Sequence, residues 1–164
     1  MVNYIKQVAG VLTEEATVAT GGAPSANKVP QLDATGKLDA TMMPPGIAAE
    51  TQSIITSEAL VAGNYVNIYN NAGTPTCRKA DASNGRPANG FVLAAFGSAI
   101  QATVYLEGTN NAVTGQVAGP IFLGTAGAGS ATAPSTSGYY SQKIGQATTA
   151  TTVTFSEGPV IVLA

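Results

Sequence analysis

Short stretches in which apolar and polar residues alternate follow one another through the last two thirds of this 164-residue chain. From Gln101 to Glu107 every second residue is apolar, and the same holds from Thr152 to Phe155. An alternation with a period of two is typical of a β-strand that has one buried face. No segment in this part of the chain sustains the period of about 3.6 that an amphipathic helix requires. The pattern therefore predicts an all-β fold.

Turn residues separate these stretches at short intervals. Asn70 to Gly73 and the dipeptides Asn84-Gly85 and Asn89-Gly90 are typical of tight turns between strands. Roughly eight to ten short strands are predicted in this way, which favours a compact β-barrel or a β-sandwich. The expected strands are 65–69, 75–80, 101–107, 120–123, 139–144, 152–155 and 159–163.

Two further segments do not alternate. Residues 91–96 form a continuous apolar run, which we interpret as a strand buried on both faces. Residues 124–137 are rich in Gly, Ala, Ser and Thr. We expect this second segment to be a mobile surface loop, and the alternative is a loop that packs against a neighbouring subunit.

Aromatic residues mark a boundary within the chain. After Tyr4 there is none until Tyr65, and the other aromatic residues all lie between Tyr65 and Phe155. Aromatic side chains contribute most to core burial, so the main core belongs to the later part of the chain. We therefore predict a β head domain at residues 50–164, preceded by an extended N-terminal arm and linker at residues 1–49.

The linker contains a repeated tetrapeptide. Leu-Asp-Ala-Thr occurs at residues 32–35 and again at 38–41, with Pro30 before the pair and Pro44-Pro45 after it. The segment is too short and too polar to bury a core of its own. Its apolar side chains can dock into grooves of another chain or fold back on the head.

The beginning of the arm leaves two structures open. Val2, Ile5, Val8 and Leu12 recur at near-helical spacing, whereas β-branched residues among and after them favour extended chain. We prefer a short strand or hook that docks on a partner. The candidate anchoring residues are Val2, Tyr4, Ile5, Val8, Leu12, Leu32, Leu38 and Met42.

Composition excludes several classes of partner. Charged residues make up only 10% of the chain, the net charge is −2, and no basic run could follow a phosphate backbone. The longest apolar stretch ends near Ile100 and is too short to span a bilayer. The first residues lack the pattern of a signal peptide. We expect no nucleic-acid or membrane partner, and synthesis and use of the protein without export.

The residue types needed for common chemistry are missing. The chain has no histidine, and Cys77 is its single cysteine, so neither a Ser-His or Cys-His dyad nor a zinc site is expected. Residues 21–28 lack the spacing of a phosphate-binding loop. Asp81 to Gly85 offers too few ligands for calcium and predicts a turn. We expect no enzymatic activity, no cofactor and no metal.

Three tyrosines lie on the predicted polar faces of their strands, Tyr65, Tyr69 and Tyr105. We interpret them as covering a second packing layer or a subunit interface. The alternative is a platform on which a sugar ring could stack.

Several stretches together resemble virion proteins of tailed bacteriophages. Residues 31–40, QLDATGKLDA, resemble the LDATGKLDAS linkers of head and tail fibres. Residues 57–69, SEALVAGNYVNIY, are similar to the opening of small β domains in capsid decoration proteins. The likeness continues at residues 78–82, 90–95, 140–147 and 158–163.

This resemblance implies a structural protein on the capsid exterior, commonly a homotrimer, whose arm binds the major capsid protein and bridges capsomers. One alternative is a tail-fibre or baseplate component whose β domain binds a host surface glycan. A free carbohydrate-binding module is another. The first hypothesis needs an arm that binds the capsid, and the other two need an exposed aromatic platform.

Overall fold

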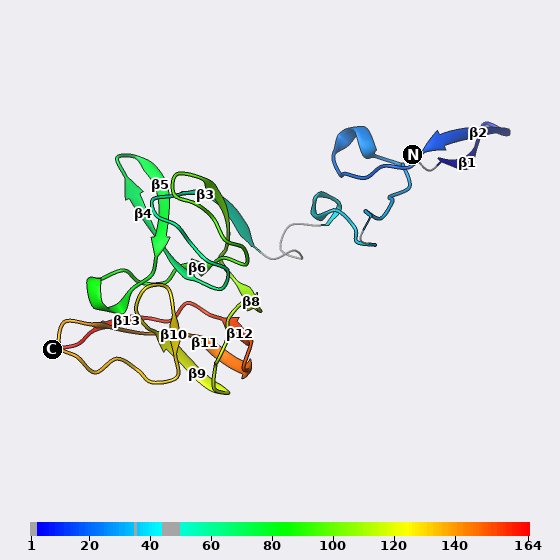
Figure 1. Cartoon of the computed structure of the whole chain (residues 1–164). Helices are drawn as coiled ribbons and strands as arrows, with labels where there is room; N and C mark the ends of the chain where they lie inside the picture. Colours follow the sequence, from blue (N-terminus) through cyan, green and yellow to red (C-terminus); the bar gives the residue numbers. More distant parts are fainter. Residues whose placement is uncertain (1–2, 35, 44–49) are drawn as a thin grey trace. The chain divides into compact units, whose positions relative to one another are not determined.

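The computed structural model describes residues 3–34, 36–43 and 50–164 (Figure 1). Contacts divide the chain into two compact units, Met1–Ala48 and Ala49–Ala164. The boundary predicted between residues 49 and 50 adjoins the segment 44–49, which lies outside the described residues. All regular elements of the described residues are β-strands or short 3₁₀ turns, so the all-β prediction is confirmed.

The first unit begins with a β-hairpin. Strands β1 (Asn3–Val8) and β2 (Val11–Ala16) pair antiparallel, so the preferred strand, and not the helix, forms at the start of the chain. Two 3₁₀ turns follow, η1 (Ala23–Ser25) and η2 (Ala40–Met42).

The rest of the first unit folds back on itself. The Val18 N–H donates to the Val29 carbonyl at 3.1 Å, and the Gln31 N–H donates to the Val18 carbonyl at 2.9 Å. The Gly21 N–H donates to the Thr41 hydroxyl at 2.7 Å. These contacts join residues far apart in sequence, so the described residues of this unit do not form the single extended arm that was predicted.

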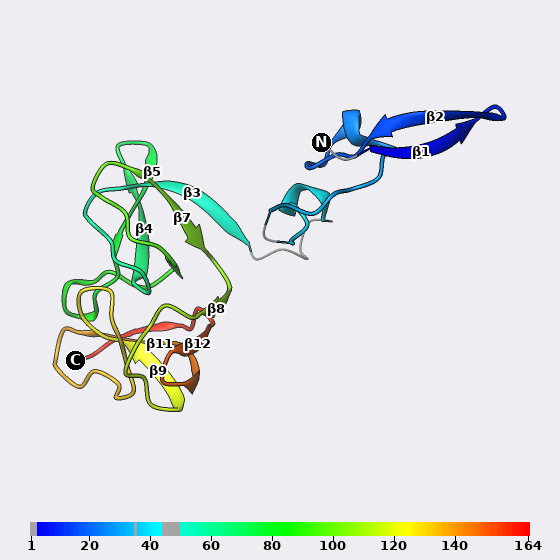
Figure 2. The same ribbon diagram turned by 45° about the vertical axis from the view of Figure 1, so that its right-hand side comes forward.

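The second unit, the head, begins with a closed five-stranded barrel in the order β3-β5-β4-β6-β7 (Figure 2). Its strands are β3 (Thr51–Thr56), β4 (Tyr65–Asn71), β5 (Thr74–Lys79), β6 (Gly90–Phe91) and β7 (Gln101–Tyr105). Strands β3 and β5 are parallel, and the other neighbours are antiparallel. Between β5 and β6 lies the 3₁₀ turn η3 (Ala82–Asn84), capped by Asp81, where the sequence predicted a turn.

A second sheet follows the barrel in the chain. It has the order β10-β9-β11-β12-β8, and β13 pairs with β11. Its strands are β8 (Gly108–Asn110), β9 (Gly119–Leu123), β10 (Gly129–Ser130), β11 (Tyr140–Thr149), β12 (Thr152–Phe155) and β13 (Val160–Val162). The sheet strands lie beside the barrel in both views of the head (Figures 1 and 2).

The head has two hydrophobic cores, and β4 contributes to both. Successive side chains of a strand point to opposite faces. Val66 therefore lies in the barrel interior with Val104 and Cys77, while Tyr65 lies in the cluster between barrel and sheet. In that cluster the Phe91 ring lies 5.6 Å from the Phe155 ring, centre to centre. Val153 and Phe155 are both buried, as the alternation in β12 predicted.

A buried glutamine connects the barrel to the second sheet. Gln142 of β11 is fully buried, and its side-chain oxygen accepts from the Ala88 N–H at 2.8 Å. Its side-chain nitrogen donates to the Ala88 carbonyl at 3.0 Å and to the Gly158 carbonyl at 3.3 Å. One side chain thus satisfies both main-chain groups of a residue in the segment before β6, as a neighbouring strand would.

The prediction for residues 91–96 is wrong beyond Val92. Only Gly90–Phe91 forms a strand, and Ala94 and Ala95 are exposed. The chain then meets the barrel again through an isolated bridge between Leu60 and Phe96. Alanine occurs both in buried strands and in exposed segments, so Ala94 and Ala95 do not show from sequence which of the two forms.

Part of the segment 124–137 is held by the head itself. The Gly127 N–H donates to the Ala80 carbonyl at 2.7 Å, and the Tyr65 N–H donates to the Gly127 carbonyl at 2.9 Å. The Ala126 N–H donates to the Asp81 carboxylate at 3.0 Å. Residues 124–130 are thereby fixed to the barrel and include β10, in contrast to the mobile loop that was expected.

Candidate functional site

The turn of the hairpin fixes its register. Ala9 and Gly10 connect the strands, and both have positive φ, 48° and 87°. Two-residue loops with positive φ at both positions match the twist of a hairpin. The register then places Val8 opposite Val11, and Gln7 opposite Leu12.

Four exposed apolar side chains lie toward the turn of the hairpin, two on each face. Residues directly opposite one another share a face, so Val8 and Val11 lie together on one face. Ile5 and Leu12 are diagonal neighbours on the other face. The exposed fraction is 49% for Val8, 63% for Val11, 71% for Ile5 and 72% for Leu12. Such a concentration of exposed apolar side chains is typical of a surface that a partner covers.

The hairpin also carries a paired polar network around Glu15. Glu15 forms an ion pair with Lys6, lies 3.7 Å from the Lys28 ammonium group, and accepts from the Tyr4 hydroxyl at 3.5 Å. The Lys6 ammonium group holds the pKa of the Glu15 carboxyl below its ordinary value, and Glu15 raises the pKa of Lys6. Tyr4 is half-buried beside Glu15 and does not join the exposed apolar group.

The aspartate of each Leu-Asp-Ala-Thr repeat accepts hydrogen bonds within the linker. In the first, the Lys37 N–H donates to the Asp33 carboxylate at 2.9 Å. In the second, the Asp39 carboxylate accepts from both the N–H and the hydroxyl of Thr41. Hydrogen bonds from Thr41 hold the pKa of Asp39 below its ordinary value. In both repeats the aspartate carboxylate thus accepts a main-chain hydrogen bond from a nearby residue.

The predicted anchoring residues differ in how exposed their side chains are. Ile5, Val8, Leu12, Leu32 and Leu38 are exposed, Tyr4 and Met42 are half-buried, and Val2 lies outside the described residues. Sequence reasoning missed Val11 as an anchoring candidate. A predicted turn at Ala9-Gly10 would have placed Val11 opposite Val8. That turn was not predicted, because its dipeptide is neither Asn-Gly nor Asp-Gly.

The three tyrosines of the head are not one surface. Tyr65 is fully buried between barrel and sheet, so its assignment to a subunit interface is wrong and the second packing layer is correct. The Tyr105 ring stacks on Phe91 with 5.3 Å between ring centres, and it packs against the same cluster. Tyr69 lies under the Arg78 guanidinium group, 4.2 Å from the ring centre. The three tyrosines therefore do not form a shared platform on which a sugar ring could stack.

The buried polar groups of the head are structural. Burial raises the pKa of the Cys77 thiol to about 11 and that of the Tyr65 phenol to about 12, with Asn110 opposing part of the rise for Tyr65. Asp81 accepts from the Ser83 N–H and hydroxyl at 2.8 and 2.7 Å. In the described part of the chain, no three acidic or cysteine side chains come close enough to hold a metal ion.

Comparison with known proteins adds no relative. No family model, no curated protein and no solved structure matches this chain. Within the described ranges there is also no helix long and apolar enough to cross a bilayer. The exposed apolar side chains of the hairpin define the candidate site, which we call its apolar end: Ile5, Val8, Val11 and Leu12.

Proposed function

We propose that this chain is a structural virion protein that decorates and stabilises the outside of a bacteriophage capsid. Its N-terminal unit binds the major capsid protein, and many copies bridge neighbouring capsomers. The observation that carries the proposal is the apolar end of the hairpin, where Ile5 and Leu12 expose more than two thirds of their surface. The resemblance to phage linkers and decoration proteins supplies the partner.

The hairpin is suited to binding by strand addition. A two-stranded hairpin is marginally stable by itself in water. Among the described residues β1 and β2 pair only with each other, which leaves the outer edge of each strand available. A capsid strand that paired with such an edge would gain main-chain hydrogen bonds, while the apolar side chains fill its pockets.

The energies fit attachment of many copies. Full burial of one Val, Leu or Ile side chain contributes about 1.5–3 kcal/mol, before the cost of association. A few such side chains give a modest single contact. When copies are also joined to one another, each further contact is intramolecular, so the array binds far more tightly than one hairpin.

Self-association as a homotrimer is the second part of the proposal. It is supported by the low charge of the head, in which Lys143 and Glu157 are the only charged residues after residue 108. Surfaces with so little charge are poorly suited to a free monomer. Light scattering on the purified chain, 16.3 kDa per copy, should give three times that mass, and a monomer at all concentrations would contradict this part.

The decisive experiment changes the apolar end of the hairpin in the full chain. The double variant Ile5→Ser/Leu12→Ser should leave the head folded and abolish binding to capsids of its phage that lack this protein. Gln7→Ser, an exposed polar position on the same face, is the matched control and should bind normally. The measurement is the number of copies that sediment with the capsid. Normal decoration by the double variant would contradict anchoring through the hairpin.

The alternative of a tail-fibre or baseplate component predicts a different place on the virion. Antibody labelling of particles, viewed by electron microscopy, separates the two. Label over the capsid supports decoration. Label confined to the tail would contradict decoration and support the alternative.

A further inference from the structure

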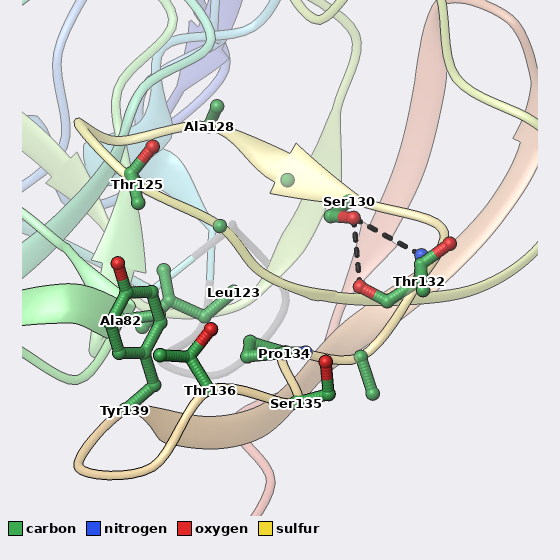
Figure 3. A pocket seen from close by; sticks show the side chains of 13 residues that line it. Ala82, Leu123, Thr125, Ala128, Ser130, Thr132, Pro134, Ser135, Thr136 and Tyr139 are labelled. Atoms are coloured by element: carbon green, nitrogen blue, oxygen red, sulfur yellow. Dashed lines mark hydrogen bonds between the residues drawn. The ribbon is translucent and has the colours of Figure 1, made fainter.

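A groove of about 450 Å³ opens on the head beside strands β9 and β10 (Figure 3). One wall is the segment 124–130, and the other is the segment 132–139 that leads to β11. The volume lies within the range of about 300–1,000 Å³ that is usual for small-molecule pockets. This groove has no part in the anchoring that we propose for the hairpin.

The floor of the groove is apolar and rigid. Leu123 and Ala82 lie there, and both are almost completely buried members of the core between barrel and sheet. The Tyr139 ring packs against that core and stands beside Leu123 and Thr136 (Figure 3). Because Leu123 and Ala82 are buried, the apolar face of a ligand would contact the half-buried Tyr139 ring and Pro134, which both line the groove.

Hydroxyl groups surround this floor, and none of the lining side chains is charged. They belong to Thr125, Ser130, Thr132, Ser135, Thr136 and Tyr139. Each hydroxyl can both donate and accept a hydrogen bond. A charged ligand would find no opposite charge in the groove, so the lining favours a neutral one.

The walls are held in place before any ligand arrives. The Ser130 hydroxyl donates to the Thr132 carbonyl at 2.8 Å and accepts from the Thr132 N–H at 3.1 Å. The Gly124 N–H donates to the Ala128 carbonyl at 2.9 Å, and the Tyr139 N–H donates to the Thr136 carbonyl at 3.1 Å. Preformed walls reduce the entropy that binding would otherwise cost.

Several of the hydroxyls remain available. Within the described residues, the side chains of Thr125, Ser135 and Thr136 and the Tyr139 hydroxyl make no hydrogen bond. They project from both walls, together with an aromatic ring and an apolar floor. A sugar ring has the matching chemistry, because its hydroxyls point outward around the edge while its C–H groups form apolar faces.

We propose that this groove binds a neutral saccharide. The ring of the sugar lies against Tyr139 and Pro134, and its hydroxyls pair with those of Thr125, Ser135 and Thr136. The inference goes beyond capsid decoration and does not rest on it. A decoration protein with such a groove would also hold the virion loosely to glycan-bearing surfaces.

Saturation-transfer NMR on the full chain tests the proposal with maltotetraose, chitotetraose and lactose as neutral probes and 3′-sialyllactose as the anionic one. At least one neutral probe should bind saturably and transfer saturation through its C–H protons. Binding of none of the neutral probes, or of the anionic probe alone, would overturn the proposal.

Variants then locate the binding. Tyr139→Ala should weaken it at least tenfold, but this residue packs on the core and its loss could disturb the fold. Ser135→Trp fills the groove from an exposed position and should abolish binding in a folded protein. Ser137→Trp, exposed and outside the groove, is the matched control and should bind normally.

Equal binding by Ser135→Trp and the wild type would overturn the assignment to this groove. The hairpin variant Ile5→Ser/Leu12→Ser should retain full saccharide binding. Failure of capsid anchoring and failure of the groove are thereby separate results.

Discussion

The hairpin and the head use apolar residues in opposite ways. In the head, Tyr65, Phe91 and Val104 are completely buried by residues of their own unit. In the hairpin, Ile5 and Leu12 are 71% and 72% exposed. A tight turn and a paired polar network around Glu15 stabilise the hairpin. The difference teaches that the stability of the head is intrinsic, whereas the apolar surface of the hairpin contributes only when a partner covers it.

The largest expected difference comes from removing one apolar side chain from each unit. Phe91→Ala should lower the free energy of unfolding of the head by about 3–5 kcal/mol, because it leaves a cavity between Tyr105 and Phe155. Ile5→Ala should change it by less than about 0.5 kcal/mol, because the side chain is exposed. Urea unfolding measures both.

Cys77 offers an independent readout of the same contrast. It is the single cysteine of the chain and fully buried in the barrel, and burial raises the pKa of its thiol to about 11. Labelling by a thiol reagent should therefore follow opening of the head, faster in Phe91→Ala and unchanged in Ile5→Ala. Equal labelling rates for the two variants would contradict the division into independent units.

A smaller effect, dependent on pH, is expected at Asp81. Burial disfavours its charged form, but hydrogen bonds from Ser83 and from the Ala126 N–H outweigh burial and hold the pKa of Asp81 below its ordinary value. Asp81→Ala should cost the head about 2–3 kcal/mol at pH 7.

The sign of the pH dependence follows from that lowered pKa. A carboxyl with a lower pKa in the folded state stabilises the fold above its unfolded pKa of about 3.9 and loses this contribution as the pH falls through the folded pKa. The difference between wild type and Asp81→Ala should thus shrink as the pH is lowered from about 5 into the acid range below the unfolded pKa. A constant difference across that range, measured by unfolding at each pH, would show that Asp81 acts without its charge.

A still smaller change, with the opposite sign, is expected at Tyr65. Its hydroxyl is buried and, within the described residues, has no hydrogen-bond partner of good geometry. Tyr65→Phe removes an unsatisfied polar group and keeps the ring, so it should be neutral or stabilise the head by up to about 1 kcal/mol. A loss of more than that in thermal or urea unfolding would mean that the hydroxyl is hydrogen-bonded in solution.

The smallest effect is confined to the first unit. Thr41→Val removes the hydroxyl that donates to Asp39 and accepts from the Gly21 N–H. The pKa of Asp39 should rise toward its ordinary value, and unfolding of the head should not change. Carboxyl titration by NMR measures this pKa, and Thr41→Ser, which keeps the hydroxyl, should restore the low value.

Much of the head could be predicted because alternation reports which face of a strand is buried. Ala102 and Val104 of β7 and Val153 and Phe155 of β12 lie where that rule places them. The rule does not say what covers the opposite face. Tyr65 was assigned to a polar face, but that face of β4 meets the second sheet, which no local pattern reveals.

The misjudged segments fail for related reasons. Residues 91–96 are apolar in composition, but the alanines among them pay little for exposure, so a run of this kind does not fix a strand. The hairpin turn at Ala9-Gly10 uses a positive φ at an alanine, a choice that residue preferences disfavour. The groove on the head is lined by segments that come together only when the head has folded, so no sequence motif predicts it.

The Gln142 side chain has a mechanical consequence for the head. Because it binds the Ala88 N–H and carbonyl and also the Gly158 carbonyl, tension that reaches Gly158 passes through β11 into the barrel. Strand β13 is joined to β11 by only three residue pairs, so residues 160–162 separate before the load reaches these bonds. When the head is pulled from its end, release of β13 should therefore come before the rupture of barrel and sheet, which the Gln142 bonds join.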